Sequence, residues 1–113
     1  MKVINGHIIH TQGSALAAWR SAIALGARHA GALPRDGAIN IDMTFVMPRP
    51  RTVTRSEPSV APDLDKLIRA VLDGLTAIAY RDDGQVTSIT ARKAYGERIG
   101  VDISLWTATQ TLL

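Results

Sequence analysis

Apolar residues in the second half of the chain recur at intervals of three and four, the spacing typical of one buried face of an α-helix. At about 100° per residue, Asp65, Arg69 and Thr76 lie along one flank of this apolar face, and Asp73 points nearly opposite the core. The pattern therefore predicts an amphipathic helix with charged groups beside its buried face. The apolar positions are Leu64, Leu67, Ile68, Val71, Leu72, Leu75, Ile78 and Ala79.

Two segments near the start of the chain carry local structure signals. Asn5 and Gly6, between residues 2–4 and 7–10, predict a tight β-hairpin turn. Ser14 suits the cap position of a helix that runs to about residue 30. The apolar side of this helix would be formed by Leu16, Trp19, Ile23 and Ala27.

Three more segments alternate apolar and polar residues in the manner of β-strands. The first is residues 38–47, which Pro48 terminates. The other two are residues 85–94 and 101–107, and a short turn connects them. We expect the last two to form an antiparallel pair. The elements together predict one α+β domain with a mixed β-sheet of four to five strands and two helices packed on it.

A pair of aspartates stands at each end of the predicted central helix. Asp63 and Asp65 stand at its start, and they converge only if Asp63 stays extended after Pro62 as the helix cap. Asp82 and Asp83 follow it. Acids are common at helix starts and in turns before glycine, so each pair alone has a structural explanation. The two pairs together also suit a divalent ion such as Mg²⁺, which prefers carboxylate oxygens.

Residues 62–86 read PDLDKLIRAVLDGLT…YRDDGQV and resemble the signature of the RusA family of Holliday junction resolvases. The resemblance extends more loosely to Phe45 and Pro48 before this segment and to Lys93 and Tyr95 after it. It implies a RusA-like fold and a Mg²⁺-dependent endodeoxyribonuclease that acts in DNA recombination and repair. Such an enzyme would resolve four-way junction DNA by paired symmetric nicks, and the resemblance implies a homodimer.

The resemblance also implies roles for individual residues. Acids at the positions of Asp63, Asp65 and Asp83 form the catalytic cluster, with one or two Mg²⁺ ions and Mn²⁺ as a substitute. Asp82 either orients a metal-bound water or serves only in the turn. Arg69 stands where the family has a lysine one helical turn after the second acid. Arginine keeps the positive charge but does not donate a proton at ordinary pH, so we expect Arg69 to orient phosphate.

A proline-rich segment, PRPRTVTRSEPSVAP at residues 48–62, leads into the first acidic pair. Its composition predicts an extended, exposed and flexible basic loop that could grip the sugar-phosphate backbone. A solvated linker remains the alternative, because no aromatic residue interleaves the arginines. The DNA-binding residues we expect are Arg49, Arg51, Arg55, Lys66, Arg69 and Lys93. The family usually has asparagine at the position of Lys66, and Lys93 is expected by resemblance alone.

The composition agrees with a small nucleic-acid enzyme. The 113 residues carry a net charge of +3, and leaving out the four clustered aspartates raises it to +7. A basic surface favours phosphate-rich partners. The chain has no cysteine, which excludes disulfides and thiol catalysis. It shows neither a membrane span nor a signal peptide, so we expect a cytoplasmic protein of bacterial, phage or prophage origin.

The two ends of the chain and two rival functions complete the expectations. The resembled family usually begins with a strand and a glycine- or proline-rich turn that are not recognisable here, so we expect a chain that lacks the N-terminal strand, and residues 108–113 read as a tail. One rival is a non-catalytic basic DNA-binding or junction-binding module. The other is a metal-dependent enzyme for a small phosphorylated substrate, although no glycine-rich phosphate loop accompanies the aspartates.

Overall fold

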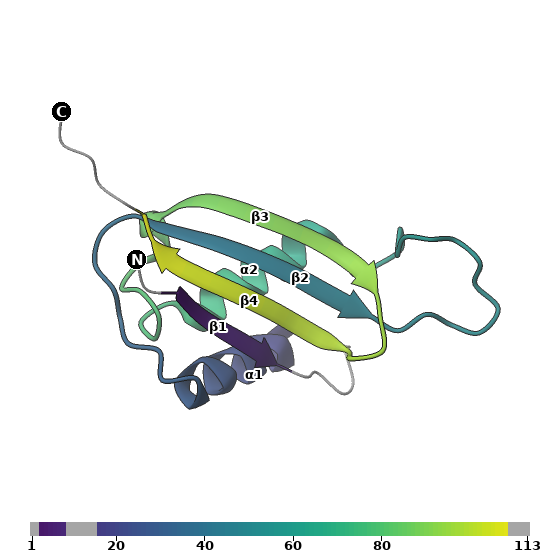
Figure 1. Cartoon of the computed structure of the whole chain (residues 1–113), viewed down its shortest axis with the longest axis horizontal. Helices are drawn as coiled ribbons and strands as arrows, with labels where there is room; N and C mark the ends of the chain where they lie inside the picture. Colours follow the sequence, from purple (N-terminus) through teal and green to yellow (C-terminus); the bar gives the residue numbers. More distant parts are fainter. Residues whose placement is uncertain (1–2, 9–15, 109–113) are drawn as a thin grey trace.

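The computed structural model describes residues 3–8 and 16–108 of the chain. Strands β2 and β3 pair in parallel, whereas β4 pairs antiparallel with both β2 and β1, giving a mixed sheet in the order β1-β4-β2-β3 (Figure 1). The elements in chain order are β1 (Val3–Ile8), α1 (Leu16–His29), β2 (Ile39–Met47), α2 (Leu64–Leu75), the 3-10 helix η1 (Asp83–Gln85), β3 (Val86–Tyr95) and β4 (Gly100–Thr107).

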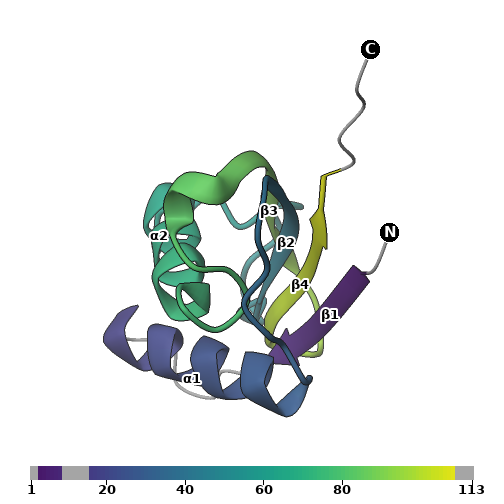
Figure 2. The same ribbon diagram turned by 90° about the vertical axis from the view of Figure 1, so that its left-hand side faces the viewer.

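Both helices lie on the same side of the sheet (Figure 2). The predicted α+β fold, with two helices packed on a mixed sheet, is therefore confirmed. The other face of the sheet carries polar residues such as Asp42, in keeping with the alternation along β2. No helix in the described parts of the chain is long and apolar enough to cross a membrane.

One hydrophobic core fills the space between the helices and the sheet. The alternating apolar residues of β2, which are Ile39, Ile41, Met43 and Phe45, are all buried there. Trp19 of α1 is 3% exposed, and its ring centroid lies 6.0 Å from that of Phe45. Trp19 therefore belongs to the core. Ser14, the predicted cap of α1, lies outside the described residues.

Two predicted strand pairings are wrong. Asn5 and Gly6 do not form a hairpin turn but lie inside β1, opposite Ser104 and Ile103 of β4. The backbone pairing along β4 therefore overrides the local turn preference of this dipeptide. Strands β3 and β4 are consecutive in the chain, yet they are not neighbours, because β2 lies between them.

The connection from β2 to β3 explains the second error. It runs through α2, and a helix crossover places two strands in parallel rather than antiparallel order. The chain then crosses the end of β2, where the Gly96 N–H donates to the Met47 carbonyl at 3.1 Å, and β4 adds on the far side of β2. A Cβ atom at Gly96 would lie 2.7 Å from Cγ1 of Val46, so a larger residue here would force Val46 to shift.

Helix α2 is shorter than the apolar pattern of its sequence predicts. It ends at Leu75, because Thr76 is extended and Ala77 adopts a positive φ of 70°. Ala79 is nevertheless buried. It lies in the turn after the helix, and its N–H donates to the Leu75 carbonyl at 2.9 Å. The pattern therefore predicted burial correctly but not the end of the helix.

Helices α1 and α2 approach closely at Gly74. A Cβ atom at this position would lie 2.9 Å from the Arg20 carbonyl oxygen and 2.9 Å from Cγ2 of Ile23. The backbone oxygen cannot rotate away as a side chain could. Gly74 therefore sets the distance between the two helices.

We predict that Gly74→Ala lowers the free energy of unfolding by about 1 kcal/mol, because overpacking of roughly 2 kcal/mol exceeds the gain in helix propensity of about 1 kcal/mol. Urea unfolding followed by circular dichroism measures the change. Gly84→Ala is the control, since its Cβ would meet only the Asp82 carboxylate at 3.4 Å or more. A Gly74→Ala protein as stable as the wild type would contradict the close helix contact.

Candidate functional site

The first acidic pair stands at the start of α2. Asp63 is the extended cap residue, with φ −69° and ψ 141°, as predicted, and its carbonyl accepts the Leu67 N–H at 3.1 Å. Its carboxylate makes no capping hydrogen bond. It lies 3.9 Å from Nζ of Lys66, and both side chains are more than 60% exposed. Asp65 is also exposed in the first turn. Neither carboxylate is therefore used to complete the helix end.

The second acidic pair belongs to η1. Asp82 caps this short helix, and its carboxylate accepts the Gly84 N–H at 3.3 Å. Gln85 completes a capping box, because its Oε1 accepts the N–H of Asp82 at 2.9 Å. These contacts support the turn interpretation of Asp82. Its role beside a metal-bound water stays a prediction.

Gln85 and Arg81 attach η1 to the segment before β2. Nε2 of Gln85 donates to the carbonyls of Arg35 and Gly37, each at 2.9 Å. Nε of Arg81 donates to Oδ1 of Asp36 at 2.6 Å, an exposed contact that adds little stability by itself. The side-chain contacts of Arg81 and Gln85, on either side of Asp83, thus fix where Asp83 lies in the fold. Sequence reasoning did not assign a role to Gln85.

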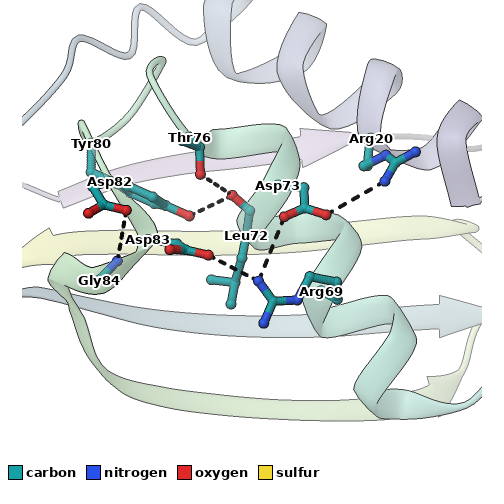
Figure 3. A network of polar contacts seen from close by, with 9 residues as sticks. All are labelled: Arg20, Arg69, Leu72, Asp73, Thr76, Tyr80, Asp82, Asp83 and Gly84. Carbon is teal, nitrogen blue, oxygen red and sulfur yellow. Dashed lines mark hydrogen bonds and ion pairs between the residues drawn. The ribbon is translucent and has the colours of Figure 1, made fainter.

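Tyr80 anchors the same turn to the end of α2. The side chain is fully buried, and its hydroxyl donates to the Leu72 carbonyl at 2.8 Å. The hydroxyl of Thr76 donates to the same carbonyl at 2.7 Å, so the last turn of α2 is closed by side chains (Figure 3). Burial raises the pKa of Tyr80 to about 12, partly offset by the hydrogen bond with Thr76.

Arg69 connects η1 to the middle of α2. Its guanidinium lies 3.0 Å from Oδ2 of Asp83 and 3.7 Å from Oδ1 of Asp73, one helical turn along α2. Asp73 in turn lies 3.6 Å from the guanidinium of Arg20 on α1 (Figure 3). Asp73 is exposed, as its position opposite the core predicted, and it lies between two arginines.

The three predicted metal ligands do not form a common cluster. Within residues 3–8 and 16–108, no three acidic or histidine side chains are arranged to hold one ion. Asp83 is paired with Arg69, whereas Asp63 and Asp65 stand at the other end of α2. Their oxygen chemistry fits Mg²⁺, and all three carboxylates are at least partly exposed. A shared ion would require Arg69 to release Asp83.

The predicted DNA-binding residues divide into two groups. Arg49, Arg51 and Arg55 lie on the loop that extends past the end of the sheet between β2 and α2 (Figure 1). Lys66 and Arg69 lie on the exposed side of α2, each paired with an aspartate. Lys93 lies on β3 and donates to the carbonyls of Val60 and Pro62, which ties the loop to the sheet.

Comparison with known proteins identifies the family. Residues 4–105 match the family described as Endodeoxyribonuclease RusA. The chain is also similar to a protein of Bacillus subtilis (strain 168) named "Uncharacterized protein YqaN", with 27% identity over 81 residues. That match covers 61% of this chain and 57% of the relative. The fold is that of a small α+β protein with acids around one helix, and the chain belongs to the RusA endodeoxyribonuclease family, as its resemblance predicted.

The raised pKa of Tyr80 predicts a loss of stability at alkaline pH. The unfolded tyrosine ionises near pH 10.0 and the folded one near 12. Between these values the unfolded state binds fewer protons, so the free energy of unfolding falls as pH rises, by about 2–3 kcal/mol at pH 12. The contribution is complete below pH 10.

Urea unfolding of the wild type and Tyr80→Phe between pH 8 and pH 12 measures this effect. At pH 8 the variant should be about 1 kcal/mol less stable, because it lacks the hydrogen bond to Leu72. The difference should shrink and reverse as pH rises. Parallel losses of stability in the two proteins would contradict the burial of a neutral phenol.

Proposed function

We propose that this protein is a Mg²⁺-dependent endodeoxyribonuclease that resolves Holliday junctions by paired symmetric nicks, in DNA recombination and repair. The observation that carries the proposal is the family match across residues 4–105, which includes the acids at both ends of α2. The exposed state of Asp63 and Asp65 supports it, since neither carboxylate caps the helix through a side-chain hydrogen bond.

Asp63, Asp65 and Asp83 would hold one or two Mg²⁺ ions, for which Mn²⁺ could substitute, and Asp82 would stand beside them. When bound, such an ion activates water as the nucleophile and stabilises the charge that develops on the phosphate. The carboxylates of Asp63 and Asp65 are exposed and therefore accessible to an ion. The carboxylate of Asp83 must exchange its partner Arg69.

Arg69 is the residue that would orient the phosphate. Its ion pair with Asp83 is exposed, with 62% and 40% of the two side chains accessible. Such pairs contribute only about 0–1 kcal/mol, so a phosphate oxygen can take the place of Asp83 at the guanidinium. The guanidinium remains protonated at ordinary pH and therefore acts through charge and hydrogen bonds rather than by donating a proton.

The basic side chains would bind the DNA backbone around this site. Arg49, Arg51 and Arg55 on the loop would contact phosphates on one side, and Lys66 and Lys93 would lie nearer the start of α2. The last two would have to exchange their present partners. A homodimer fits this activity, because two opposed strands must be cut and two-fold symmetry supplies two equivalent sites.

We predict that Asp65→Asn reduces Mg²⁺-dependent nicking of a four-way junction to background and leaves junction binding within about twofold of the wild type. The change removes a charged oxygen ligand but no basic contact. Gel analysis of labelled junction strands measures nicking, and fluorescence anisotropy measures binding. Asp42→Asn is the matched control, since Asp42 is an exposed acid on the opposite face of the sheet.

The wild type and Asp42→Asn proteins should nick the junction equally. Nicking that persists in a clean preparation of Asp65→Asn would refute the assignment of the acidic residues.

A second prediction concerns Arg69. Arg69→Gln should lower the nicking rate at saturating Mg²⁺ roughly a hundredfold, the effect of losing one charge-stabilising donor, and Arg69→Lys should retain more of it. Arg69→Gln should also reach half of its own maximal rate at a lower Mg²⁺ concentration, because Asp83 loses its competing cation. Titration of the nicking rate with Mg²⁺ measures both effects.

Arg92→Gln is the matched control, since Arg92 is exposed on the face of β3 that points away from the helices. An Arg69→Gln protein with the wild-type rate would contradict a phosphate contact by Arg69.

One observation favours a second function. The described residues hold no assembled group of three potential metal ligands, and Asp83 already has a cationic partner. A non-catalytic junction-binding protein would keep the basic surface without needing the acidic cluster. It would bind four-way junctions in a salt-sensitive manner and produce no Mg²⁺-dependent nicks.

A further inference from the structure

Tyr95 at the end of β3 lies between two arginines of the loop. The guanidinium carbon of Arg49 lies 4.6 Å from the centroid of the Tyr95 ring, within the range of a cation–π contact. Nε of Arg55 donates to the Tyr95 hydroxyl at 2.9 Å. The fold thus supplies from another element the aromatic residue that the loop sequence itself lacks.

The two arginines are also connected to each other. NH1 of Arg49 donates to the carbonyl of Arg55 at 2.9 Å, closing the part of the loop between them. Lys93, two residues before Tyr95, holds the far end of the loop through the carbonyls of Val60 and Pro62. The basic segment is therefore attached to β3 at several points and is not simply a solvated linker.

The described residues do not neutralise the charges of this cluster. Neither Arg49 nor Arg55 lies within ion-pair distance of a carboxylate in the described part of the chain. Each has one N–H engaged in the contacts above, out of the five that a guanidinium carries. Two exposed cations with free donors, held close together, favour an anionic ligand.

We propose that Arg49, Arg55 and Tyr95 form a preformed clasp for the phosphates of a DNA backbone, in which the two arginines bind phosphate and Tyr95 is the positioning residue. The inference rests on the proposed function, because it takes DNA as the ligand. The ring of Tyr95 orients Arg49 and its hydroxyl orients Arg55. Holding these long side chains before binding lowers the entropy lost when phosphate is bound.

The position of the clasp relates it to the acids. Tyr95 and Lys93 point to the same face of β3 and are about 7 Å apart along the strand. Lys93 contacts the carbonyl of Pro62, the residue before Asp63. The clasp therefore lies on the side of the molecule where α2 and its first acidic pair begin, suited to hold DNA beside that pair.

The experiment measures binding of a four-way junction without Mg²⁺ by fluorescence anisotropy, over a series of salt concentrations. Arg55→Gln and Arg49→Gln should each reduce the slope of log affinity against log salt by about one. Tyr95→Phe keeps the ring below Arg49 but loses the hydroxyl, so affinity should fall about two- to fivefold. Circular dichroism melting confirms that each variant is folded.

A double-mutant cycle separates positioning from a direct contact. Tyr95→Phe should have no further effect in the Arg55→Gln background, because the hydroxyl then has no guanidinium to orient. In the Arg51→Gln background its effect should equal that in the wild type, since Arg51 is an exposed arginine of the same loop with no contact to Tyr95. Arg51→Gln is thus the matched control for charge.

A second readout needs no DNA. Tyr95→Leu removes both contacts, so trypsin should cut after Arg51 and Arg55 faster than in the wild type. The clasp would be overturned if Tyr95→Phe had equal effects in the Arg55→Gln and Arg51→Gln backgrounds, or if trypsin cleavage were unchanged. Either result would leave the proposed junction binding and nicking intact. A wild-type protein that binds no junction DNA would overturn the proposed function as well.

Discussion

The hydrogen bonds that converge on the Leu72 carbonyl are the contacts on which the site depends. The hydroxyls of Tyr80 and Thr76 donate to this oxygen, and together they end α2 and fold the following turn back beside it. Because Tyr80 is fully buried, the turn cannot move away without exposing the ring and its hydroxyl. Gln85 then fixes η1 from the other side. Asp83 is brought against Arg69 as a consequence, although the two residues are far apart in the sequence.

Opposite charges are distributed over two connected regions of the molecule. On the exposed side of α2, Arg69 lies between Asp73 of the same helix and Asp83 of η1. The loop after β2 carries arginines without acidic partners in the described residues, and Lys93 joins that loop to the start of α2. Under the proposed function, phosphate would approach along the basic loop, and the exposed acids at the start of α2 would be available to a divalent ion.

The sequence predicted periodic features well and non-local pairings poorly. The alternation in β2 and the apolar stripe of α2 identified core residues such as Phe45 and Leu67, because burial follows local periodicity. The hairpin at Asn5 was wrong because this segment pairs along β4, and the pairing of β3 with β4 was wrong because strand order depends on the crossover through α2. The acids were found by their motif, but their relation to Arg69 was not, since it depends on the turn that Tyr80 anchors. Tyr95 was noted only by resemblance, because its arginine partners lie forty or more residues earlier in the chain.

The most direct test of the central claim is an assay of the unmodified protein on a synthetic four-way junction and on the matching linear duplex, each with and without Mg²⁺. The account predicts paired nicks at symmetric positions in two opposed strands of the junction, only with Mg²⁺, and an intact duplex. A junction that is bound but never nicked when Mg²⁺ is present, or a duplex cut as readily as the junction, would contradict it.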